Sequence, residues 1–157
     1  MLKIKNYNSS ILHEISFSLK ENENLIILGE NGAGKSTLAK VLSNLISNDK
    51  VELLGENISK ISDLKRTQLI NYIPPKLSIF DEYVTLREFL ELSFIENVNN
   101  QKIDEVIKLL NLKKLEDKYC KSFSSGEKQL LLLASAIMHN AQITIFDELT
   151  ANLDISR

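Results

Sequence analysis

Residues 29–37 read GENGAGKST, a run that places three glycines, a lysine and two hydroxyl side chains within nine positions. It matches the spacing G-x-x-x-x-G-K-[ST], in which glycines let backbone N–H groups approach an anion without an intervening Cβ. The lysine adds a positive charge, and the hydroxyl after it can bind Mg²⁺. We therefore predict a site for ATP or GTP with Mg²⁺. The predicted binding residues are Gly29, Glu30, Asn31, Gly32, Ala33, Gly34, Lys35, Ser36 and Thr37.

A pair of carboxylates, Asp147 and Glu148, directly follows the short β-branched run ITIF. A carboxylate at the end of a strand is well placed to hold the metal of a phosphate site. We therefore predict that Asp147 and Ser36 are metal ligands. Glu148 would lie where water approaches the terminal phosphate, and we predict that it acts as the catalytic general base.

A phosphate site of this kind needs a strand before the glycine turn and a helix after it. Residues 25–28 are continuously apolar, which predicts a strand that is buried on both faces. Leu38, Val41, Leu42 and Leu45 then recur at helical spacing. The turn is therefore expected to join a buried strand to a helix.

Other segments predict further strands and helices. LKIKNY and ISFSL alternate apolar and polar residues, as half-exposed antiparallel strands do, and VELLGENI and INYIP each predict one short strand. ITIF predicts a second buried strand. Two helix starts are indicated by capping-box patterns, one from Thr85 to Glu88 and one from Ser124 to Glu127. An apolar stripe predicts another helix through Ile103, Val106, Ile107 and Leu110.

The composition suits one compact cytosolic domain. The 157 residues are 43% hydrophobic, enough for a single core. The 19 basic and 21 acidic side chains give a net charge of -2, so nucleic acid is not an expected partner. The one cysteine, Cys120, cannot form an intramolecular disulfide and is expected to be buried. There is no apolar run of about 20 residues and no signal-peptide pattern at the start of the sequence.

The segment FSSGEKQ, residues 123–129, resembles the signature motif of ATP-binding-cassette (ABC) proteins, which usually reads LSGGQ or LSGGE. The order GENGAGKST, NYIPP, FSSGEKQ, ITIFDE and TANLD is also that of the family. The resemblance implies an α/β fold with a P-loop NTPase (RecA-like) core, an N-terminal antiparallel β subdomain and an inserted helical subdomain. Residues 1–157 would then be one domain that lacks the usual C-terminal part. Residues 1–75 and 142–157 would form its core, and 76–141 its helical subdomain.

The same resemblance assigns roles to further residues. Ser124, Gly126 and Glu127 would cover the ATP that is held by the glycine turn of a second subunit. Tyr7 matches the aromatic residue that stacks on adenine, although its position equally suits an edge-strand tyrosine. Asp154 matches a loop that communicates across the dimer.

Several positions depart from the family pattern. Pro75 stands where the family usually has a glutamine that contacts Mg²⁺ and the attacking water. Ser125 replaces a glycine of the signature, Leu149 a common proline and Leu130 a common arginine. The family's switch histidine has no counterpart, since His13 and His139 do not match it. Both histidines are expected to be surface or turn residues.

These features predict the Mg²⁺-dependent ATPase subunit of an ABC transporter, working as a homodimer or with another ABC subunit. ISDLKRTQLINYIPP and DEYVTLREFLEL are similar to ATPases of bacterial iron-siderophore, haem and cobalamin importers, which implies import. Membrane subunits would dock near residues 74–83, at the cytoplasmic face of the cell membrane. The alternative is a non-transport or degenerate ABC clamp that binds ATP with little hydrolysis, which Pro75 and Ser125 make credible.

Overall fold

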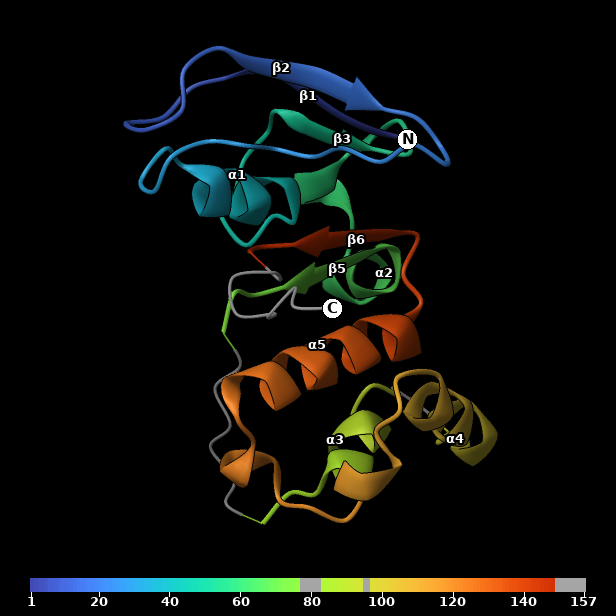
Figure 1. Ribbon diagram of the computed structural model, residues 1–157. Coiled ribbons are helices and arrows are strands. Elements are labelled where there is room, and N and C mark those ends of the chain that lie inside the picture. Colours follow the sequence, from blue (N-terminus) through green and yellow to red (C-terminus); the bar gives the residue numbers. More distant parts are fainter. Residues whose placement is uncertain (77–82, 95–96, 149–157) are drawn as a thin grey trace. The chain divides into compact units, whose positions relative to one another are not determined.

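The computed structural model describes residues 1–76, 83–94 and 97–148 of the chain. The chain divides into two compact units, Met1–Tyr72 and Ile73–Arg157, and the division falls within strand β5 (Ile70–Ile73). Both units contain helices and strands, so the fold is mixed α/β as predicted (Figure 1). The boundaries predicted for a core of 1–75 with 142–157 and a helical subdomain of 76–141 stay a prediction.

The first unit contains a four-stranded antiparallel sheet with the order β2-β1-β3-β4. Its strands are β1 (Leu2–Tyr7), β2 (Ile15–Leu19), β3 (Val51–Leu53) and β4 (Glu56–Asn57). In β1, Leu2 and Ile4 are buried while Lys3 and Lys5 are exposed, as the alternation in the sequence predicted. The strands expected at LKIKNY and ISFSL are confirmed.

One expected strand is instead a hairpin. VELLGENI was predicted as a single strand, but β3 and β4 are joined by Leu54 and Gly55, which both have positive φ (53° and 84°). Such a pair of left-handed residues reverses the chain between antiparallel strands. The prediction was wrong because leucine rarely adopts this backbone conformation.

The strand predicted at residues 25–28 is also absent among the described residues. Leu25, Ile26, Ile27 and Leu28 are not part of either sheet, and their exposed fractions range from 41% to 87%. A continuous apolar run becomes a buried strand only where neighbouring strands and covering helices enclose it. Within the described residues, no strand pairs with this segment, so its apolar side chains stay exposed.

Helices in the first unit are short. Helix α1 (Lys35–Leu42) buries Leu38, Ala39, Val41 and Leu42. Leu45 was expected on the same stripe, but it is 62% exposed because the helix ends before it at the Ser43 cap. Helix α2 (Asp63–Leu69), which Ser62 caps, and the 3-10 turn η1 (Ile58–Lys60) were not predicted.

The second unit is built around helix α5 (Ser125–His139), against which α3 (Leu86–Glu91) and α4 (Asn100–Leu109) pack (Figure 1). Both predicted capping boxes are confirmed, at Thr85 and Ser124. The common core consists of Leu86, Leu90, Ile103, Val106, Ile107, Leu112, Cys120, Phe123, Leu131, Ala134 and Met138. The chain between α4 and α5 contains two 3-10 turns, η2 (Lys113–Leu115) and η3 (Cys120–Ser122).

Strand β6 (Ile143–Phe146) is confirmed as a strand and forms a two-stranded sheet with β5. It is less buried than predicted, since Phe146 is 44% exposed. On α5, Leu132 and Ala136 are buried with Ile73 of β5 in a separate small cluster. In the described ranges, no helix is long and apolar enough to cross a membrane.

Core packing of the second unit predicts a clear contrast between two leucines. Leu90→Ala removes a side chain that is 0% exposed, so it should lower the free energy of unfolding by about 2–5 kcal/mol. Leu109→Ala makes the same chemical change at a helical position that is 69% exposed, and it should change stability by less than about 0.5 kcal/mol. Urea denaturation followed by circular dichroism measures both. Equal losses would contradict the packing described for α3.

Burial raises the pKa of the Cys120 thiol to about 11. Because the thiolate is the reactive form, Cys120 in the folded chain should react with a disulfide reagent at pH 8 about a hundredfold more slowly than in guanidinium chloride. Absorbance of the released thiol follows the reaction. Rapid labelling without denaturant would show that Cys120 is accessible.

Candidate functional site

The glycine turn, residues 29–34, leads directly into α1, whose first three residues complete the GENGAGKST motif. Gly34 is the N-cap residue and has left-handed backbone angles (φ 91°, ψ 12°). No side chain caps this helix, and its first turn holds no acidic residue. The first N–H groups of a helix have no intrahelical acceptor and carry its positive dipole end. The start of α1 is therefore suited to an anion.

The ammonium group of Lys35 lies against the turn itself. Its Nζ atom donates hydrogen bonds to the backbone carbonyls of Gly29 at 2.8 Å and Glu30 at 2.9 Å. These contacts hold a positive charge over the glycine turn. A bound phosphate would compete with the two carbonyls for this ammonium group.

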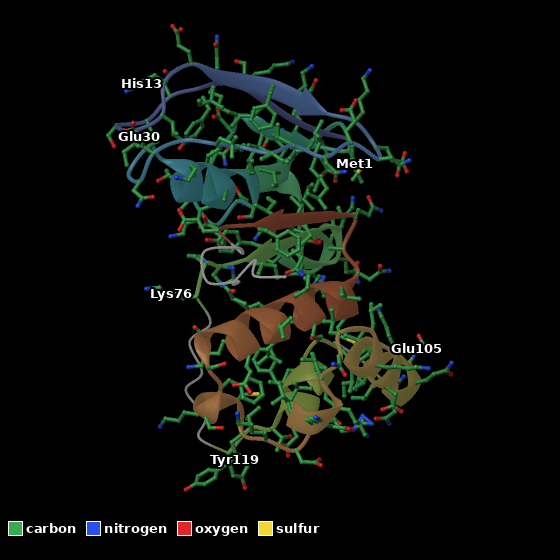
Figure 2. All side chains as sticks on the ribbon, in the orientation of Figure 1. Met1, His13, Glu30, Lys76, Glu105 and Tyr119 are labelled. Carbon is green, nitrogen blue, oxygen red and sulfur yellow. The ribbon has the colours of Figure 1, made fainter. Side chains whose placement is uncertain are left out.

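The connection between β1 and β2 packs against the turn, which the sequence did not indicate. A Cβ on Gly34 would lie 2.8 Å from Leu12 Cδ2 and 2.9 Å from Ile11 Cγ2. Figure 2 shows His13 of this connection and Glu30 of the turn at the same end of the first unit. Ile11 is 51% exposed, so an apolar side chain stands beside the turn. In the sequence, Ile11 and Leu12 stand out only as two apolar residues in the otherwise polar run NSSILHE.

Tyr7 lies at the end of β1, opposite Ile15 of β2, and is 9% exposed. β1 lies between β2 and β3, but its pairing with β3 covers only Leu2 to Ile4, so the strand order does not contradict the edge-strand interpretation at Tyr7. Stacking on adenine stays a prediction. The burial favours a packing role, since a stacking ring needs an accessible face.

The two carboxylates after β6 have different surroundings. Asp147 is 4% exposed, and its N–H donates a 3.0 Å hydrogen bond to the Ile73 carbonyl of β5. Glu148 is exposed and has a left-handed backbone (φ 55°). A buried carboxylate and an exposed one thus stand next to each other at the end of β6.

The predicted metal ligands fit Mg²⁺ by their chemistry. The Ser36 hydroxyl and the Asp147 carboxylate are both oxygen donors, which Mg²⁺ prefers, and Mg²⁺ usually keeps water and phosphate oxygens in its other positions. Ser36 belongs to the first unit and Asp147 to the second. No group of three or more histidine, cysteine or acidic side chains that could hold a metal occurs in the described part of the chain.

The FSSGEKQ segment starts α5 through a complete capping box. The Ser124 hydroxyl accepts a 3.3 Å hydrogen bond from the Glu127 N–H, and the Glu127 carboxylate accepts a 2.7 Å bond from the Ser124 N–H. The pKa of Glu127 is lowered, first by this bond from the Ser124 backbone and then by Lys118 and the Ser124 hydroxyl. Ser124 and Ser125 are exposed at the helix start.

The departures from the family pattern have different structural settings. Pro75 follows β5 and is half-buried, and Leu130 packs at the border of the helical core. His13 is exposed as expected, but His139 is half-buried at the end of α5, where burial lowers its pKa. Leu149, Asp154 and part of the predicted docking segment 74–83 lie outside the described residues.

Comparison with known proteins shows which family these motifs belong to. A family model described as ABC transporter matches residues 12–151. The zinc import ATP-binding protein ZnuC of Buchnera aphidicola is 33% identical over 161 residues, which are 98% of this chain and 63% of that protein. The lactococcin-A transport/processing ATP-binding protein LcnC of Lactococcus lactis is 33% identical over 162 residues, covering 95% of this chain and 22% of that protein.

A solved bacterial Atm1-family ABC exporter with ATP bound has the same fold over 98% of this chain, with a TM-score of 0.85 and 22% identity. The chain covers 30% of that exporter. It therefore spans less than two thirds of the length of each of these three proteins.

The packing at Gly34 predicts the effect of a single methyl group. Gly34→Ala would place a Cβ 2.8 Å from Leu12 in a left-handed backbone, and both effects distort the turn. We expect the affinity for a fluorescent ATP analogue to fall at least about tenfold, since the distorted N–H groups no longer converge on a phosphate.

Gly55→Ala is the matched control for Gly34→Ala. Gly55 has a similar positive φ (84°), but nothing lies within 4 Å of a Cβ built there. This variant should lose stability through backbone strain and keep its nucleotide affinity. Unchanged nucleotide binding in Gly34→Ala would contradict the assignment of the turn.

Proposed function

This chain belongs to the ABC transporter family, and we propose that it binds and hydrolyses ATP to power the membrane-spanning subunits of a transporter. The observation that carries the proposal is the start of α1, where a glycine turn and a lysine meet a helix end without a side-chain cap. Such an arrangement suits a polyphosphate and has little other use in the fold.

Within the proposed ATP site, each residue has a separate role. Backbone N–H groups from Gly32 to Thr37 would surround the β-phosphate, while Lys35 exchanges its carbonyl contacts for the β- and γ-phosphates. Ser36 and Asp147 would hold Mg²⁺, which neutralises charge on the terminal phosphates. Glu148, as an exposed carboxylate, would accept a proton from the attacking water.

We propose that the FSSGEKQ segment completes the ATP site of a second cassette, either another copy of this chain or a related ABC subunit. Ser125 and Gly126 are the first two residues of α5, and a helix leaves the N–H groups of such positions without intrahelical acceptors. The Ser124 hydroxyl stands beside them. Together they would contact the γ-phosphate on the other cassette.

Import is the proposed direction of transport. The importer-like segments ISDLKRTQLINYIPP and DEYVTLREFLEL support it, and so does the likeness to a zinc import protein over 63% of that protein. LcnC, named for lactococcin-A transport and processing, is matched over 22% of its length. Membrane subunits would dock near residues 74–83, which places the chain at the cytoplasmic face of the membrane.

A second candidate function is an ABC clamp that binds ATP with little hydrolysis. Pro75 favours it, because proline offers no side-chain donor or acceptor for Mg²⁺ or the attacking water. The two candidates share ATP binding and differ in the rate of turnover.

Glu148→Gln separates the two candidates. If Glu148 is the general base, this variant should release phosphate at least about a hundredfold more slowly while still binding Mg-ATP. Its mass by light scattering should double in Mg-ATP, because the closed dimer no longer hydrolyses its nucleotide. Glu14→Gln is the control, since Glu14 is also exposed and also has a positive φ (53°).

A parent chain that dimerises in Mg-ATP without releasing phosphate would establish the clamp instead. Phosphate release by Glu148→Gln at the parent rate would remove Glu148 from the catalytic role.

A further inference from the structure

Lys118 forms an ion pair with the first turn of α5. Its Nζ atom lies 3.0 Å from Glu127 Oε1 and 3.3 Å from Glu127 Oε2. The same ammonium group lies 5.4 Å from the centre of the Phe123 ring. Lys118 therefore contacts Phe123, which precedes α5, and Glu127, which lies in its first turn.

The backbone of Lys118 is itself held in place. Its N–H donates to the Leu115 carbonyl at 3.0 Å, and its carbonyl accepts from the N–H of Leu86, the first residue of α3, at 3.3 Å. Two residues before Lys118, the Glu116 carbonyl accepts a hydrogen bond from the Arg87 N–H at 3.2 Å. Because Leu86 is fully buried in the core, this hydrogen bond ties the Lys118 backbone to the packed start of α3.

The charge of Glu127 lies at the helix start. Its carboxylate accepts the 2.7 Å hydrogen bond from the Ser124 N–H, which fixes it beside the first N–H groups of α5. In the proposed function, these N–H groups meet the γ-phosphate of a second cassette. An uncompensated carboxylate at this place would repel that phosphate and offset the positive helix end.

We propose that Lys118 is a positioning residue that neutralises Glu127 and so allows the N-terminus of α5 to receive the nucleotide phosphate of the second cassette. This inference rests on the proposed function. Glutamine, the other residue that signature motifs carry at this position, brings no charge and would need no such lysine. In this chain, Lys118, which lies before η3, therefore supplies the counter-charge for the glutamate of the signature.

Charge compensation makes a specific prediction for a double-mutant cycle. In the Glu148→Gln background, Lys118→Met keeps a long apolar side chain over Phe123 but removes the charge. It should weaken Mg-ATP-dependent dimerisation about fivefold. Glu127→Gln removes the carboxylate and should tighten the dimer, and Lys118→Met with Glu127→Gln should recover most of the loss. Light scattering over a concentration series in Mg-ATP gives the four dimer constants.

Three controls separate charge from folding. Lys118→Arg keeps the charge and should dimerise like the parent. Lys118→Met should bind a fluorescent ATP analogue as the parent monomer does, because the glycine turn belongs to the other unit. Its dimerisation defect should also shrink in high salt, which screens the partly exposed Glu127 charge.

The outcomes distinguish this inference from the proposed function. If the parent dimerises but the double variant is as weak as Lys118→Met, Lys118 acts through packing and the inference is overturned. An unchanged dimer constant for Lys118→Met overturns it as well. If the Glu148→Gln chain binds Mg-ATP and never dimerises, a sandwich of two copies of this chain is disproved and this inference falls, while ATP binding by the glycine turn stands.

Discussion

The proposed phosphate site depends on the left-handed backbone of Gly34. This one residue ends the glycine turn, begins α1 and makes room for Leu12 and Ile11 from the β1–β2 connection. A residue with a Cβ could not adopt the same φ of 91° without strain, and it would also collide with Leu12. The direction in which the first N–H groups of α1 point is therefore set by packing inside the first unit.

The helix starts in the described residues differ in whether a side chain caps them. Side-chain oxygens of Ser62, Thr85, Asn99 and Ser124 cap α2, α3, α4 and α5. Helix α1 alone among these five starts without a side-chain cap. Because capping stabilises a helix by about 1 kcal/mol, its omission is a cost that a bound anion can offset. The described helices thus differ in one respect: a side-chain oxygen accepts from an early N–H group in α2 to α5, and none does so in α1.

Local patterns explain which elements were predictable from the sequence. The capping boxes at Thr85 and Ser124 and the alternation in β1 each involve residues close in the chain, and the structure has all three. The β3–β4 turn was missed because Leu54 gives no sign of a positive φ. Burial of residues 25–28 depends on elements distant in sequence, and the exposed fractions of 41% to 87% show that a local pattern cannot decide it. The packing of Ile11 on Gly34 was hidden for the same reason.

Ser125 and Gly126 occupy the two positions at which the signature motif usually has glycines. Ser125 is the first residue of α5 and has no positive φ, so replacing a glycine there costs no backbone strain. Gly126 follows within the helix, where glycine is about 1 kcal/mol less favourable than alanine. Nothing within 4 Å would obstruct a Cβ on Gly126, so the packing of this chain does not require a glycine there. The open space at Gly126 leaves room for the nucleotide of a second cassette in the proposed function.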